Sequence, residues 1–249
     1  MKQGIRLFVC AVALLLVSIP PVTAQMRQTR QLRRPLINSV VLDDFDSPDN
    51  QWIVRGSRFI NEDFLEWEWV RAWPEALYRQ EPEGRTLRAL GVRAAFNRIG
   101  YNFLEIIPAA ENDEGELVPR AIPIPGTAQS IDLWVWGSNR NYYVDVQLRD
   151  YRGLVHTLRL GDINFRGWSN LFVDVPTWIP QDSIFVPQRQ GLELVKLVLW
   201  TRPTERVNEF FVYFDELRVV TNLAEDYWDG ERLADPEQVQ ELWNEARGM

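Results

Sequence analysis

The sequence predicts an all-β protein, an antiparallel jelly-roll-like β-sandwich that is followed by a short C-terminal helix. Two observations predict this fold. Short segments with alternating apolar and polar residues recur between turn-forming residues, and helical periodicity is almost absent before the last part of the chain. The predicted strands cover residues 40–45, 64–70, 86–96, 102–108, 130–136, 142–150, 154–160, 171–176, 192–200 and 210–220.

Residues 1–24 have the features of a signal peptide. Lys2 and Arg6 give a positive start, "LFVCAVALLLVSI" forms a short apolar run, and small residues precede a cleavage site near Ala24. The apolar run is too short to cross a membrane comfortably, so we expect an exported, soluble chain that is not embedded in a membrane. Cleavage would also remove Cys10, the only cysteine of the 249 residues, so disulfides cannot stabilise the remaining chain.

Charge divides the exported chain into three parts. Residues 25–38 form a basic N-terminal arm, residues 39–222 a β-sandwich domain, and residues 223–249 an acidic tail. The formal net charge of −8 argues against nucleic acid as a partner, because phosphate binding needs a positive surface. The arm contains four arginines and no acid, namely Arg27, Arg30, Arg33 and Arg34.

Three segments refine the predicted sandwich. The segment 192–200 is apolar on both faces, which is typical of a central strand. The connection from Asp150 to Gly153 predicts a hairpin over residues 142–160. Residues 108–126 contain four prolines and two glycines and are predicted to form one long loop inside the domain.

The tail predicts one helix. Asp235 is a suitable N-cap, Pro236 suits the first turn, and Val239, Leu242 and Trp243 share one face at helical spacing. So narrow an apolar stripe does not stabilise an isolated helix in water, so we expect it to pack on its own domain or on a neighbour.

Signatures of catalysis are scarce, and we predict that the protein is not an enzyme and needs no cofactor. The single histidine, His156, lies within a predicted strand and is expected on a sheet surface. No glycine-rich phosphate-binding motif is present.

Asp43 and Asp44 in the first strand and Asp215 and Glu216 in the last strand would be neighbours if these strands pair, and such acids suit calcium. Charges at turns and sheet edges are the favoured interpretation, so no metal site is predicted.

Tryptophan is abundant, with 11 residues in the chain. In residues 130–136, Ile131, Leu133 and Val135 share one face, whereas Trp134 and Trp136 lie on the other. Trp67 and Trp69 alternate with acidic residues in the same way. We expect one tryptophan of the 134/136 pair to complete a packing layer and the outer aromatic surface to bind a partner. Carbohydrate-binding modules and protein interfaces both use such surfaces.

The segment from Ser130 to Pro176 resembles the central part of the spirochaete flagellar filament outer layer proteins, the FlaA family. The shared elements are an aromatic strand that ends at Gly137, the "LRD-x-x-G" hairpin at 148–153, "LGDINF" at 160–165 and "GWSNL" at 167–171. "RALGVRAAF" and "EIIP" resemble an earlier strand pair of the family, and "FDELRVV" and "EDYWDGE" resemble its last strand and acidic tail.

The resemblance implies a structural sheath subunit in the periplasm that coats the flagellin core of periplasmic flagella. Its expected partners are flagellin core subunits, other sheath proteins and further copies of itself. The predicted partner-binding residues are Trp67, Trp69, Trp134, Trp136 and Trp243 together with the four arginines of the arm, and the arm is predicted to contact the acidic tail of a neighbour head to tail. A carbohydrate-binding module on a galactose-binding-like sandwich is the alternative, and a glycosidase or lyase on the same scaffold the least favoured one.

Overall fold

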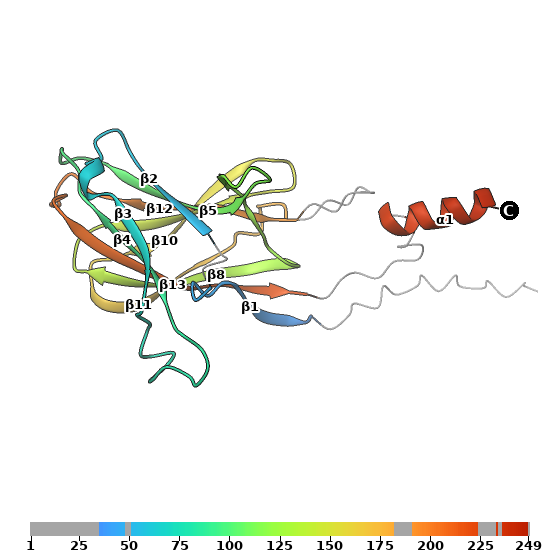
Figure 1. The fold of residues 1–249 in the computed structure, drawn as a ribbon, viewed down its shortest axis with the longest axis horizontal. Helices are drawn as coiled ribbons and strands as arrows, with labels where there is room; N and C mark the ends of the chain where they lie inside the picture. The colour runs from blue at the N-terminus through green and yellow to red at the C-terminus, as the bar shows by residue number, and fades with distance from the viewer. Residues whose placement is uncertain (1–34, 48–50, 182–190, 224–232, 234–235, 249) are drawn as a thin grey trace, which may run out of the picture. The chain divides into compact units, whose positions relative to one another are not determined.

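The computed structural model describes residues 35–47, 51–181, 191–223, 233 and 236–248. Within these residues two antiparallel sheets face each other around one hydrophobic core (Figure 1). The six-stranded sheet has the order β11-β8-β13-β4-β3, and β1 also pairs with β13. It consists of β1 (Ile37–Asp43), β3 (Glu66–Val70), β4 (Ala89–Ala94), β8 (Thr127–Ser138), β11 (Arg166–Asp174) and β13 (Phe210–Asn222).

The seven-stranded sheet has the order β10-β9-β12-β5-β2, and the short strands β6 and β7 pair with β5 and β12. It consists of β2 (Gln51–Gly56), β5 (Phe103–Glu111), β6 (Leu117–Pro119), β7 (Ile122–Pro123), β9 (Tyr143–Arg149), β10 (Val155–Asp162) and β12 (Glu193–Trp200). The predicted fold class is therefore confirmed.

Alternating side chains place the core between the sheets. On β8, Ile131, Leu133 and Val135 are fully buried. On β9, Val144 and Val146 are buried in the same way. Because successive residues of a strand point to opposite faces, the residues between these positions form the outer face of each sheet.

Each of the ten predicted strands is present. β2 was not among the predicted strands, because Trp52, Ile53 and Val54 are consecutive apolar residues without visible alternation. As predicted, β12 is central in its sheet and β9 and β10 form a hairpin. Residues 108–126 are not a single loop: β5 extends to Glu111, a turn closed by Asn112 follows, and β6 pairs back onto β5. Gly115 has φ of +78° in this turn, a conformation that glycine adopts without strain.

The pairing of β1 with β13 places both ends of the domain together. Ile37 lies opposite Asn222, so the segments before β1 and after β13 join the sandwich at the same end. At the other end, β13 begins with Phe210 opposite Ala94 of β4. The arm and the tail therefore attach at one end of the domain, and the loops that precede β5 and β13 lie at the other.

The predicted tail helix is present as α1 (Pro236–Gly248). Leu242 and Trp243 on its apolar face are 39% and 63% exposed. In the part of the chain that the structure describes, no helix is long and apolar enough to span a membrane. The predicted signal peptide and Arg27, Arg30, Arg33 and Arg34 lie outside the described residues.

Candidate functional site

The outer face of the six-stranded sheet carries a row of aromatic side chains across three neighbouring strands. Trp168 of β11 lies opposite Trp136 of β8, which lies opposite Tyr213 of β13. The rings of Trp136 and Tyr213 meet edge to face with centroids 5.4 Å apart. Together with Trp134, Phe172 and Phe211 on the same face, these residues form what we call the outer aromatic surface.

Both tryptophans of the 134/136 pair belong to this surface. They lie two residues apart on β8 and each is half-buried, so both face outward from the sheet and neither enters the core between the sheets. Trp134 lies opposite Asn170 on one side and Asp215 on the other.

A hollow lies beside this surface. It has a volume of about 190 Å³ and is lined by Glu66, Trp67, Glu68, Val70, Gly91, Val92, Arg93, Phe211 and Tyr213. The ring of Tyr213 extends over Gly91 of β4, where an added Cβ would lie 2.9 Å from the ring. A partner side chain of moderate size fits such a volume.

Trp67 and Trp69 lie on the opposite side of the sheet from this surface. Both are half-buried and pack against the core from the edge strand β3. The indole Nε1 of Trp67 donates a hydrogen bond to the backbone oxygen of Trp52 at 3.1 Å. Their acidic neighbours Glu66 and Glu68 face outward and form the rim of the hollow.

The outer face of the seven-stranded sheet carries a second aromatic row, which was not predicted from the sequence. Tyr143, Trp200 and Phe103 are neighbours on β9, β12 and β5. The guanidinium of Arg159 lies 3.5 Å from the centroid of Tyr143, and that of Arg202 lies 5.0 Å away. The two arginines cover Tyr143, so this row offers less free ring area than the outer aromatic surface.

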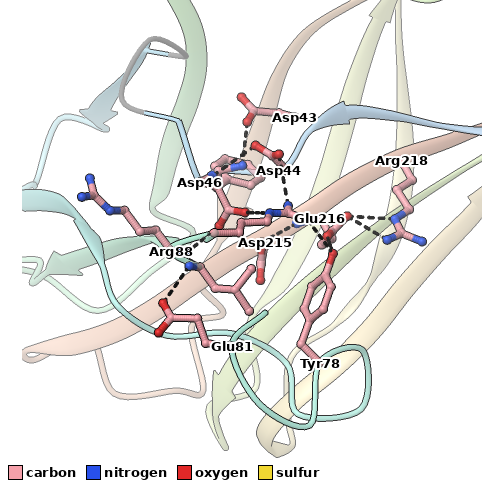
Figure 2. Close-up of polar contacts among 12 residues, drawn as sticks. Asp43, Asp44, Asp46, Tyr78, Glu81, Arg88, Asp215, Glu216 and Arg218 are labelled. Carbon is pink, nitrogen blue, oxygen red and sulfur yellow. Dashed lines mark hydrogen bonds and ion pairs between the residues drawn. The ribbon is translucent and has the colours of Figure 1, made fainter. Parts of the chain in front are cut away.

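Acidic residues of the first and last strands meet beside β13 (Figure 2). Asp43 and Asp44 come from β1 and the turn after it, and Asp215 and Glu216 from β13. The segment between β3 and β4 covers them: Arg85 bonds to Asp46 at 2.5 Å and to Asp44 at 3.2 Å, and the Tyr78 hydroxyl donates to Glu216. Arg218 also donates to Glu216, at 2.8 Å.

This cluster is a structural ion-pair network in the described residues. Among them, no group of three or more histidine, cysteine or acidic side chains is arranged to hold a metal ion. The carboxylate of Asp43 instead accepts from the Trp52 indole at 2.7 Å and from the backbone nitrogen of Phe45 at 2.8 Å. The interactions fasten the segment between β3 and β4 to the first and last strands.

Asp215 differs from the other acids of this cluster in that its pKa is strongly raised. Its side chain is almost fully buried. Burial, and then the negative charges of Glu216, Asp46 and Asp44, raise its pKa to about 8, although a backbone hydrogen bond from Glu216 acts in the opposite direction. Asp215 is therefore mostly protonated at neutral pH.

His156 is held by a buried carboxylate at the end of the β9–β10 hairpin. Its Nε2 lies 2.9 Å from Asp150, and its ring meets Trp178 edge to face. Burial raises the pKa of Asp150, but hydrogen bonds from His156, Leu154 and Arg152 outweigh it and lower this pKa to about 2. The Asp150 carboxylate closes the turn, since the backbone nitrogens of Arg152 and Leu154 also donate to it.

The fold and these surfaces define a jelly-roll-like β-sandwich protein that presents aromatic side chains on its outer faces. A model of the flagellar filament outer layer protein FlaA family matches residues 37–226. The chain belongs to this family of flagellar filament outer layer proteins.

A flagellar filament outer layer-like protein of Brachyspira hyodysenteriae is 26% identical over 134 residues. This match covers 54% of the chain and 57% of the relative, so the chain spans little more than half the length of that relative.

Solved structures with a similar arrangement include two carbohydrate-binding modules. The module TmCBM61 in complex with β-1,4-galactotriose is 13% identical, with a TM-score of 0.38 over 70% of this chain and 88% of the module. The family 11 module of a Clostridium thermocellum cellulase is 11% identical, with a TM-score of 0.40 over 77% of this chain and 99% of the module. At such scores the likeness supports no conclusion about a ligand.

Proposed function

We propose that the chain is a non-enzymatic sheath subunit that coats the flagellin core of periplasmic flagella and contributes to filament stiffness, shape and motility. Family membership supports the flagellar role. The observation that carries the docking proposal is the outer aromatic surface, which brings six aromatic residues to one face of a sheet. Exposed aromatic area of this kind is characteristic of protein interfaces, where aromatic anchors supply most of the binding free energy.

Flagellin core subunits are the proposed partners of this surface, with other sheath proteins beside them. The basic arm contributes long-range attraction to acidic neighbours, and exposed ion pairs of this kind weaken with salt. The arm-to-tail contact expected from the sequence stays a prediction, because Arg27, Arg30, Arg33 and Arg34 lie outside the described residues.

Co-sedimentation with purified core filaments tests the docking surface. Phe172 and Phe211 are 66% and 42% exposed, so Phe172→Glu combined with Phe211→Glu should preserve folding. We expect this variant to bind core filaments at least tenfold more weakly than the unchanged chain, because two charges would enter a desolvated interface.

Val155→Glu is the matched control, since Val155 is similarly exposed but lies on β10 of the other sheet. It should bind as the unchanged chain does. Equal binding by all three chains would refute the docking surface. Saturable binding of a glycan that is lost in Trp134→Ala and Trp136→Ala, without filament binding, would instead favour the carbohydrate-binding module.

A further inference from the structure

Two loops are joined by backbone contacts into a small platform at the end of the sandwich opposite Ile37 and Asn222. The backbone nitrogen of Asn97 donates to the oxygen of Phe59, and that of Asn61 donates to the oxygen of Ala95, both at 2.9 Å. An isolated β-bridge joins Ile60 to Phe96. We call the exposed part of this platform the basic tip, and it consists of Arg58, Phe59, Arg98, Ile99 and Tyr101.

The basic tip combines apolar area with positive charge. Ile99 and Tyr101 are 58% and 67% exposed. The guanidiniums of Arg58 and Arg98 lie 5.7 and 5.4 Å from the ring centroid of Phe59. Among the described residues neither arginine forms an ion pair, whereas Arg85, Arg93, Arg149, Arg159 and Arg202 all do. A segment that is both acidic and apolar complements such a surface.

The tail has this complementary chemistry. Val239, Leu242 and Trp243 form one apolar stripe on α1, and Leu242 and Trp243 are exposed. The same helix carries Glu241 and Glu245, and the sequence before it is rich in acids. A helix of 13 residues is only marginally stable alone in water, so burial of its apolar stripe would stabilise it.

The basic tip lies at the opposite end of β13 from the point where the tail begins. The strand runs for 13 residues between these two ends, a distance of roughly 40 Å at about 3.3 Å per residue. A contact between the tail of one copy and the tip of the next is heterologous and leaves a free tail and a free tip. Repetition of such a contact produces an open filament.

We propose that α1 of one copy docks on the basic tip of a second copy of this chain and thereby links the subunits head to tail. The proposal rests on the proposed function for its setting, a coat that runs along a filament. The interface is small, below about 1,200 Å², so we expect weak association in solution that an array of sites on a filament strengthens.

Two variants with complementary defects test the contact by sedimentation velocity over a rising protein concentration. The tip variant carries Arg58→Glu and Arg98→Glu, and the tail variant carries Leu242→Ala and Trp243→Ala. We expect the unchanged chain to form oligomers and each variant alone to associate at least tenfold more weakly. An equimolar mixture should form one-to-one dimers and no longer chains, because it contains only one functional pair of surfaces.

A control chain with Arg120→Glu and Gln240→Ala should associate as the unchanged chain does, since both residues are exposed and lie outside the two surfaces. An unchanged chain that stays monomeric, variants that associate normally, or a mixture that forms no dimer would each refute the proposal. Filament binding without tip-to-tail association would refute it and leave the proposed function intact. Association without filament binding would support the tip-to-tail contact and refute the proposed function.

Discussion

Asp215→Asn should stabilise the protein at neutral and alkaline pH and should flatten the fall of its stability as pH rises. The raised pKa of about 8 means that the folded protein holds a proton which the unfolded chain releases near its ordinary value of 3.8. Between these two values the unfolded state binds fewer protons, so the free energy of unfolding decreases by about 1.4 kcal/mol for each pH unit.

The amide of the variant does not titrate and can still accept the backbone hydrogen bond from Glu216 that Asp215 accepts at 2.8 Å. We therefore expect similar stability of the two proteins near pH 4 and a gap that widens to a few kcal/mol by pH 8. Urea unfolding at a series of pH values measures this difference. The contribution of other titrating groups cancels in the comparison.

Asp174→Asn serves as the control, because Asp174 is exposed on β11 and lies outside this cluster. Its free energy of unfolding should differ from that of the unchanged protein by less than about 0.5 kcal/mol at each pH. Parallel stability curves for Asp215→Asn and the unchanged protein would show that Asp215 is ionised in the folded state.

Asp43→Ala should cost about 3 kcal/mol or more of stability. Its carboxylate accepts hydrogen bonds from the indole of Trp52 and the backbone nitrogen of Phe45, and both partners are buried. Removal of the acceptor leaves two buried donors without these bonds, at about 1–3 kcal/mol each. Phe45 also has φ of +54°, so its position depends on local restraint.

Equilibrium unfolding in urea measures this loss. Asp43→Asn keeps one acceptor oxygen and should fall between the unchanged protein and Asp43→Ala. Asp174→Ala, at an exposed position of β11, should change stability by less than about 0.5 kcal/mol. If Asp43→Ala were as stable as Asp174→Ala, the two hydrogen bonds would contribute nothing to folding.

Local alternation was enough to predict most of the strands. In β8, Ile131, Leu133 and Val135 alternate with polar and aromatic residues, and this pattern alone indicates which face is buried. The short strand β6 had no such signal, because its three residues are exposed and it forms only by pairing with β5. Pairing partners far away in sequence are not encoded in any short window.

The candidate surfaces could be predicted from the sequence less completely than the strands, because their members come together only in the tertiary structure. Trp134 and Trp136 were identified as partner contacts from their spacing, but Trp168 and Tyr213 join them only through the register of three strands. The same alternation in β3 gave no indication of which face is buried, and the structure directs Trp67 and Trp69 toward the core. The basic tip could not be predicted from the sequence, because Phe59 and Ala95, which starts the second loop, are 36 positions apart.

The sequence by itself determined the all-β class, the tail helix and the family, since these follow from residue spacing and from ordered motifs that any copy of the chain retains. Only the tertiary structure decided which tryptophans face outward, that the arm and the tail join one end of the domain, and that Asp215 is buried among acids. These properties arise from strand register and burial, which depend on residues brought together from distant parts of the chain.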